Sequence, residues 1–149
     1  MNSPTTTAST DLALAARLRL AITRTARRLR QEAGAHLTPS QVAALATIEK
    51  RGPLTPSELA DVERIQRPTA TRVAAHLTER GLVQRADDPG DGRVSLLSVT
   101  AEGQALLDEV RSRKNAYLAD RMDGLSADDR EALQRAADVL ERMLEDRDA

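Results

Sequence analysis

The sequence predicts a mainly α-helical fold that carries one small β-hairpin, and three observations support this class. Apolar residues recur at three- and four-residue steps through most of the chain, as on the buried face of a helix. Two Thr-Pro-Ser segments, at 38–40 and 55–57, have the form of helix starts. Between 82 and 99 the pattern becomes strand-like on both sides of a run of turn formers. The expected order is four helices, a hairpin and two further helices.

The composition narrows the chemistry that the chain can perform. Its 149 residues fit one domain, and the absence of cysteine excludes disulfides, thiolate metal sites and thiol-based redox sensing. The two histidines and the carboxylates show no metal-ligand spacing, and no nucleophile–base pair or glycine-rich phosphate loop is present in the sequence. We therefore expect no metal or other cofactor, and we expect that the protein is not an enzyme.

The N-terminal segment and the lengths of the apolar runs indicate the cellular location of the protein. No apolar run approaches the ~18 residues of a membrane span, and the first ten residues have neither the basic region nor the apolar core of a signal peptide. A cytoplasmic protein with no membrane partner is expected. Residues 1–10 are rich in threonine and serine and are expected to form a disordered tail before a single domain over 11–149.

The third and fourth expected helices form a helix-turn-helix candidate, because they are short and a tight connection joins them. From Arg64 to Arg85 the chain has five arginines and one glutamate, a net charge of +4 within a protein of net charge −1. A helix fits the major groove of duplex DNA, and its N-terminus presents N–H groups to phosphates. The segment therefore indicates a surface that binds double-stranded DNA, although each arginine taken alone could belong to an ordinary solvated face.

Individual roles follow from the chemistry of the side chains. Hydroxyls of threonine can bond bases or phosphates, and the arginine in the middle of the fourth helix can contact guanine or clamp a phosphate. Arginines before that helix lie on the approach to the DNA backbone, and the arginine of the hairpin can enter the minor groove. The candidate DNA-binding residues are Arg64, Gln66, Arg67, Pro68, Thr69, Thr71, Arg72, His76, Asp91 and Arg93.

The hairpin carries a tight Asp91-Gly92-Arg93 turn in which the carboxylate of Asp91 is expected to hold Arg93 or a nearby arginine in place. A generic turn with an exposed ion pair of little energetic value is the alternative.

Four segments together resemble the signature of the MarR family of winged-helix regulators. They are Gln66-Arg67-Pro68-Thr69-Ala70-Thr71-Arg72, Leu77-Thr78-Glu79-Arg80-Gly81-Leu82-Val83, Asp91-Gly92-Arg93, and the stretch 97–103. The resemblance covers about residues 11–146 and implies a winged helix-turn-helix fold with a DNA-binding lobe over about 38–100. It also implies that the terminal helices, about 11–34 and 101–146, form a dimerisation region. Many members carry a further charged residue where this chain has Gly92, so fewer contacts from the wing are expected.

The resemblance also implies a function. The family members are homodimers that bind pseudo-palindromic operators, and many are repressors that respond to a small anionic or phenolic effector in a cleft between the dimerisation region and the DNA-binding lobe. His36 and Tyr117 are candidate residues of that cleft, although a loop histidine and a core tyrosine are ordinary alternatives. A winged-helix module that binds protein without binding DNA is the alternative function.

The charges of the terminal helices are complementary. The segment 11–33 has a net charge of +4, and the segment 120–149 has a net charge of −5. If the two segments meet across a two-fold axis, the dimer is expected to weaken with salt more than an apolar interface would. Two independently solvated helices are the alternative.

Overall fold

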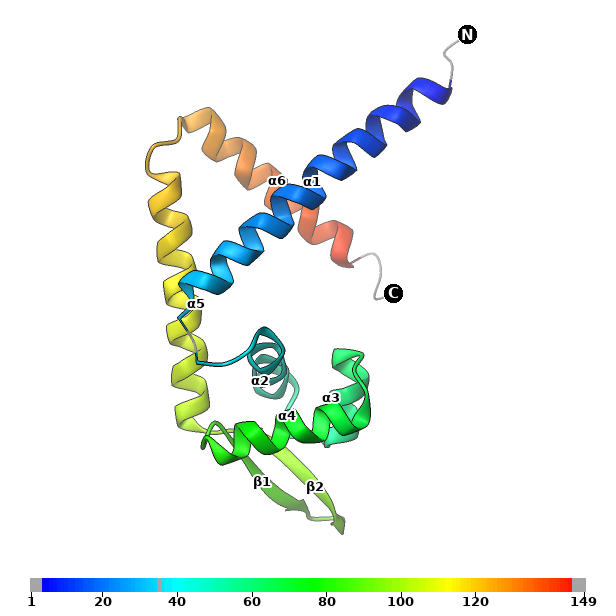
Figure 1. Ribbon diagram of the computed structural model, residues 1–149, viewed down its shortest axis with the longest axis vertical. Coiled ribbons are helices and arrows are strands. Elements are labelled where there is room, and N and C mark those ends of the chain that lie inside the picture. Colours follow the sequence, from blue (N-terminus) through cyan, green and yellow to red (C-terminus); the bar gives the residue numbers. More distant parts are fainter. Residues whose placement is uncertain (1–3, 35, 146–149) are drawn as a thin grey trace. The chain divides into compact units, whose positions relative to one another are not determined.

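The computed structural model describes residues 4–34 and 36–145, and these residues form six helices and a two-stranded antiparallel hairpin (Figure 1). This confirms the predicted mainly helical class with one hairpin. The elements, in chain order, are α1 (Pro4–Glu32), α2 (Pro39–Arg51), α3 (Pro56–Glu63), α4 (Arg67–Glu79), β1 (Val83–Asp88), β2 (Asp91–Val99), α5 (Ala101–Met122) and α6 (Ala127–Glu145).

The described residues divide into two compact units, one within Met1–Lys114 and the other within Asn115–Ala149. The first unit contains α1 to α4, the hairpin and most of α5, and the second contains the end of α5 and α6. The expected DNA-binding lobe over 38–100 lies in the first unit. Among the described helices, none combines the length and apolarity needed to cross a bilayer.

The first helix starts earlier than the sequence predicted. It begins at Pro4, so the expected disordered tail over 1–10 is wrong for residues 4–10, while residues 1–3 lie outside the described residues. Proline in the first helical turn costs no hydrogen bond, because the N–H that it lacks would have had no partner there. The threonines that follow each disfavour a helix by at most about 0.7 kcal/mol, which does not stop it.

Two capping boxes set the starts of α2 and α3, as the sequence predicted. The Thr38 hydroxyl accepts the Gln41 N–H at 3.3 Å, and the Gln41 side chain accepts the Thr38 N–H at 2.9 Å. Thr55 and Glu58 exchange the same pair of bonds at 3.1 and 2.7 Å. Because each cap is completed within four residues, the starts of these helices are determined locally.

The core of the first unit lies between α2, α3, α4 and the hairpin. Its fully buried side chains come from all of these elements and are Leu45, Ile48, Leu59, Leu77, Val83 and Leu97. Leu97 also exchanges two backbone hydrogen bonds with Leu54, at 2.8 and 3.1 Å, so the segment before α3 pairs with β2. The sequence does not predict this pairing, since it joins residues far apart in the chain.

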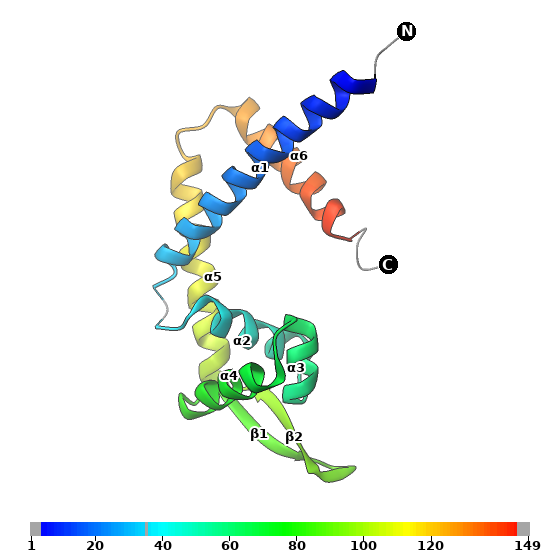
Figure 2. The same ribbon diagram turned by 45° about the vertical axis from the view of Figure 1, so that its right-hand side comes forward.

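The hairpin is longer than its sequence pattern indicated. The strands were expected over 82–85 and 93–99, but the pairing continues to Asp87 opposite Ser95 and Asp88 opposite Asp91. Backbone hydrogen bonds do not depend on apolar side chains, so exposed aspartates can extend the ladder. In both views the hairpin extends beyond the helices of its unit to a free tip (Figure 2).

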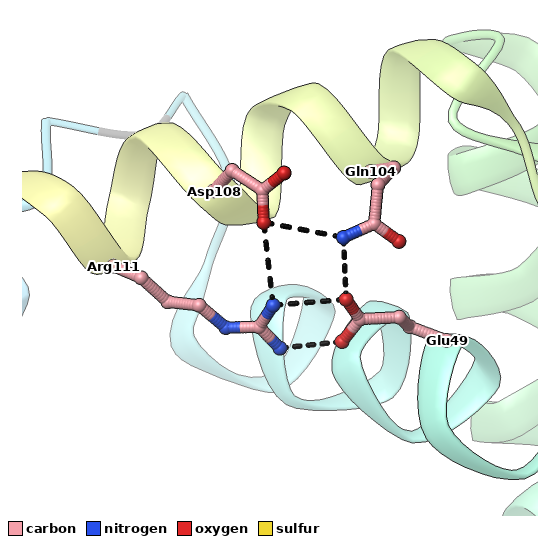
Figure 3. Close-up of polar contacts among 4 residues, drawn as sticks. All are labelled: Glu49, Gln104, Asp108 and Arg111. Carbon is pink, nitrogen blue, oxygen red and sulfur yellow. Dashed lines mark hydrogen bonds and ion pairs between the residues drawn. The ribbon is translucent and has the colours of Figure 1, made fainter.

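A carboxylate on α2 and a guanidinium on α5 join these two helices (Figure 3). Glu49 accepts bonds from both terminal nitrogens of Arg111 and, at 2.6 Å, from the Gln104 side chain. Asp108 lies further from the same donors, at 3.2 Å from the Gln104 nitrogen and 3.5 Å from Arg111. Chiefly through the hydrogen bond from Arg111, the network lowers the pKa of Glu49 to about 2. The same pair raises the pKa of Arg111.

Replacing Glu49 with glutamine should destabilise the protein in a pH-dependent way. The folded-state pKa is lowered, so the ionised carboxylate stabilises the fold above the unfolded-state value near 4.5 and ceases to do so as the pH falls toward 2. At pH 6 we expect Glu49→Gln to lower the free energy of unfolding by about 1–2 kcal/mol. The difference from the wild type should shrink between about pH 4.5 and 2, as measured by urea denaturation.

Asp108→Asn is the matched control for this experiment, because Asp108 makes only the longer bonds of the network. Its effect at pH 6 should be smaller than that of Glu49→Gln. A difference between the wild type and Glu49→Gln that stays constant from pH 6 to pH 2 would contradict the assigned role of Glu49.

Candidate nucleic-acid interface

The fourth helix buries one face and leaves the other in solvent. Ala70, Ala74 and Leu77 are completely buried, and they recur at the spacing of a single helical stripe. Pro68 and Arg72 are four residues apart on the opposite face, and both are exposed. The packing of the stripe against the core therefore turns the predicted base-reading arginine outward.

A tight turn with an unusual backbone conformation joins α3 to α4. Arg64 ends α3 in the left-handed region, at φ 53° and ψ 43°, although it is not a glycine. Its N–H bonds to the carbonyls of Ala60 and Asp61, and the N–H of Ile65 bonds to Ala60 at 3.0 Å. This geometry costs an arginine about 1–2 kcal/mol relative to an ordinary helical conformation. The exposed Arg64 side chain is thereby set immediately before α4.

The start of α4 has no side-chain cap. Gln66 occupies the N-cap position without a side-chain hydrogen bond to the helix, and Pro68 supplies no N–H. Arg67 is exposed like Gln66, whereas Thr69 is half-buried. The N-terminal N–H groups of α4 therefore have no side-chain acceptor among the described residues, and they carry the positive end of the helix dipole.

Two other predicted residues lie further along α4. Thr71 is exposed, and its hydroxyl donates to the Arg67 carbonyl at 3.0 Å, which leaves its oxygen able to accept another bond. His76 is half-buried in the third turn of the helix. Thr71 therefore adds a polar group to the exposed surface, while His76 is less accessible than Arg72.

The hairpin presents Arg93 near its tip. Asp91 accepts the backbone N–H of Arg93 at 3.0 Å, and Asp88 accepts that of Gly90 at 2.6 Å. The expected support of Arg93 by Asp91 therefore runs through the backbone, and no ion pair of the Arg93 side chain occurs in the described part of the chain. Both Asp91 and Arg93 are exposed, so the guanidinium can reach an external anion.

The arginines of this surface share one electrostatic property. In the part of the chain that the structure describes, ion pairs involve only arginines of α5 and α6. The exposed guanidinium groups without a carboxylate partner there include Arg64, Arg67, Arg72, Arg85 and Arg93. We call this set, on the turn, α4 and the hairpin, the basic surface.

A cavity of about 480 Å³ lies between α1, α2 and α5 within the first unit. Its walls are mainly apolar, with Leu29, Val42 and Val110 among them, and two cations, Arg30 and Lys114, border it. Such a cavity has the size and lining of a small-molecule site.

Neither predicted cleft residue lines this cavity. His36 is exposed and borders a smaller hollow of about 240 Å³ together with Arg80 and Arg113. Tyr117 belongs to the second unit, where the Arg121 guanidinium lies 5.2 Å from the centre of its ring. The sequence does not predict the cavity residues, because apolar side chains that line a cavity cannot be told from core residues in a single sequence.

Comparison with known proteins identifies the family. The sequence model of the protein family described as MarR family matches residues 37–95. An uncharacterized HTH-type transcriptional regulator of Mycobacterium leprae is 37% identical over 137 residues, covering 91% of this chain and 96% of the relative. The chain belongs to the MarR family. The predicted resemblance is confirmed, and so is the prediction that the protein is not an enzyme, because this family consists of transcriptional regulators.

Solved structures agree with this MarR-family fold. A protein from Pseudomonas aeruginosa described as a transcriptional regulator superposes with a TM-score of 0.83 at 34% identity, over 91% of this chain and 96% of that one. FabT of Streptococcus pneumoniae, solved in complex with DNA, has a TM-score of 0.67 at 20% identity, over 89% and 98% of the two chains. At that identity the second likeness shows the winged-helix fold alone.

The left-handed turn of this MarR-family chain predicts how substitutions at Arg64 behave. Arg64→Gly should change the free energy of unfolding by less than about 1 kcal/mol, because relief of strain offsets the greater freedom of the unfolded chain. Arg64→Val should lower it by about 1–2 kcal/mol more, since a β-branched residue is disfavoured at positive φ. Chemical denaturation measures both values.

Arg67→Val is the control for the turn, since Arg67 begins α4 with a helical backbone. If Arg64→Val and Arg67→Val were equally destabilising, the left-handed conformation of residue 64 would have no energetic consequence.

Proposed function

We propose that this MarR-family regulator binds double-stranded DNA sequence-specifically as a homodimer and acts in the cytoplasm as a ligand-responsive repressor. The observation that carries the DNA-binding part is the basic surface, a set of exposed arginines without carboxylate partners in the described residues. It lies on the helix-turn-helix and the hairpin of a fold that FabT shares, and FabT was solved with DNA. The proposed contact residues remain those predicted from the sequence.

The positions of α4 and the hairpin indicate which part of the DNA each of them contacts. The free face of α4 enters the major groove, where Arg72 contacts a guanine edge or a phosphate and Thr71 adds a hydroxyl. The uncapped start of α4, with Arg64 and Arg67 beside it, faces the phosphates. Arg93, on the hairpin, reaches the neighbouring minor groove, whose negative potential attracts a guanidinium.

The homodimer is supported by apolar side chains that the single chain leaves in solvent. On α1, Leu12 and Leu14 are 73% and 50% exposed, and on α6 Met143 and Leu144 are 59% and 74% exposed. No described residue of α6 is buried. Monomers rarely leave large apolar side chains of two helices so exposed, so a second copy of the chain is the proposed partner. A two-fold dimer binds a pseudo-palindrome with half-sites about 10 base pairs apart.

An anionic effector is supported by the 480 Å³ cavity, which adjoins α1 on one side and α2 of the DNA-binding lobe on the other. Arg30 and Lys114 can pair with a carboxylate or phenolate, while the apolar walls accept a small ring or chain. Such a molecule lowers the affinity for DNA only if it binds more tightly to a form of the dimer that does not fit the operator.

Replacing single arginines of the basic surface with alanine should weaken binding to DNA without unfolding the protein. Arg72→Ala and Arg93→Ala should each lower the affinity for the operator about tenfold, because each removes an exposed guanidinium. The wild type should lose affinity steeply as salt rises, since binding releases counterions from the phosphates. Fluorescence anisotropy with duplexes selected from a random pool measures both effects.

Arg135→Ala, which removes an exposed arginine paired with Glu131 on α6, is the matched control and should bind DNA like the wild type at protein concentrations that keep both proteins dimeric. If no duplex binds in a salt-dependent manner, the alternative function, a winged-helix module that binds protein, is favoured instead.

The dimer should dissociate more readily at high salt. The arginines of α1 are exposed and unpaired with carboxylates in the described residues, while the segment 120–149 has a net charge of −5, so opposite charges are available across the interface. We expect the dissociation constant to rise about tenfold between 50 and 500 mM salt. Analytical ultracentrifugation gives this value, and a constant dissociation constant would remove the electrostatic contribution.

Leu12→Ala serves as the apolar comparison for that measurement, because Leu12 is largely exposed in the single chain. It should weaken the dimer by a similar factor at both salt concentrations, since apolar burial does not depend on screening at these concentrations.

A further inference from the structure

Two guanidinium groups hold the loop that joins α1 to α2. Arg80, the C-cap of α4, donates from Nη1 to the carbonyl of His36 at 2.6 Å. Arg113, on α5, donates from Nη1 to the carbonyl of Ala33 at 3.4 Å. The loop is thus tied to the proposed recognition helix on one side and to α5 on the other, and it lies beside α5 in both views (Figures 1 and 2).

The backbone of the loop is shaped to admit Arg113. Gly34 has a φ of +61°, and a Cβ placed on it would lie only 2.3 Å from Nη1 of Arg113. A side chain at this position would therefore displace the guanidinium as well as strain the backbone. The absence of a side chain at Gly34 therefore leaves the space that the guanidinium of Arg113 occupies.

Few other contacts fix α1 relative to the rest of its unit. Among the side chains described in α1, only Ala26 and Leu29 are partly buried, and the others are exposed. Ala33, directly after the helix, is buried. The position of α1 therefore depends heavily on the loop and on the groups that hold it.

The side chain of Arg80 has no other role visible in the described residues. It is exposed, it forms no ion pair there, and its one hydrogen bond is the bond to the His36 carbonyl, while the backbone N–H of Arg80 bonds to the carbonyl of His76 within α4. A hydrogen bond from a charged donor to a carbonyl stabilises more than a neutral one. The bond spans 44 residues of sequence and joins the last turn of α4 directly to the segment that leads from α1.

We propose that Arg80 is a positioning residue that fixes the recognition helix relative to α1 and thereby sets the separation of the two recognition helices in the dimer. The proposal rests on the proposed function, because only a DNA-binding dimer requires that separation. Ala33 and Val110 border both the hollow beside Arg80 and the 480 Å³ cavity. A molecule that moves the loop from within the cavity therefore acts on the same bond.

Arg80→Gln tests this role, with Arg85→Gln as the matched control. Arg85 is also exposed and carries the same charge, and its side chain makes no hydrogen bond in the described residues, although its backbone lies in the ladder of β1 and β2. In the free protein, hydrogen exchange of backbone amides over 36–42 should speed up about tenfold in Arg80→Gln and stay unchanged in Arg85→Gln. Unchanged exchange in Arg80→Gln would overturn the proposal, whether or not the protein binds DNA.

Binding to DNA separates positioning from direct contact. We expect Arg80→Gln to lower operator affinity about tenfold while the slope of log affinity against log salt stays that of the wild type, because no phosphate contact is lost. A slope reduced by about 0.9 would mean that Arg80 contacts a phosphate, which overturns the positioning role. The variant should also discriminate less than the wild type against operators whose half-sites are moved apart by two base pairs.

The two parts of this experiment distinguish the two proposals. If the wild type binds no duplex but Arg80→Gln still speeds up hydrogen exchange over 36–42, the proposed function is wrong, while the contribution of Arg80 to the stability of the loop stands. If the wild type binds DNA and Arg80→Gln changes neither hydrogen exchange nor the discrimination between half-site spacings, the positioning role of Arg80 is wrong while the proposed function stands.

Discussion

The packing of one face of α4 is the constraint on which the rest of the interface depends. Ala70, Ala74 and Leu77 are completely buried against the core of the first unit. Two of these residues are alanines, so α4 lies close to its neighbours and has little freedom to rotate about its axis. A rotation that buried Arg72 would also expose Leu77 and cost about 1.5–3 kcal/mol in lost apolar burial. The outward direction of the basic residues is therefore enforced by apolar packing.

What the sequence predicts well in this fold is local. The capping boxes at Thr38 and Thr55 are complete within four residues, so both helix starts follow from adjacent side chains. The pairing of Leu54 with Leu97 could not be predicted in the same way, because a single Leu54 has no alternating pattern around it. The hairpin was underestimated for a related reason: its outer part is held by backbone bonds between aspartates and serine, whose side chains disfavour strands.

In the candidate site, too, the features that follow from the local sequence could be predicted and the long-range contacts could not. The net charge and the spacing of arginines over 64–85 were enough to predict an exposed basic helix, because an arginine opposite an apolar stripe has to face solvent. The bond from Arg80 to His36 was not predicted, because its acceptor is a backbone carbonyl that no side-chain pattern reports. His36 was chosen for a ligand cleft on its position in a loop, but the cavity is lined mainly by apolar residues of three helices.

The acidic residues of the hairpin explain how a basic surface can include an acidic tip. Asp88 and Asp91 each accept a backbone N–H of the turn, so their charges are used to hold the conformation that carries Arg93. Asp87 makes no such bond in the described residues and adds a negative charge that a phosphate would meet. The aspartates therefore hold the tip in one conformation, but their negative charge also repels the phosphates of DNA. In the proposed interface with DNA, Asp88 and Asp91 therefore fix the backbone that carries Arg93, and the guanidinium of Arg93 supplies the attraction to the phosphates.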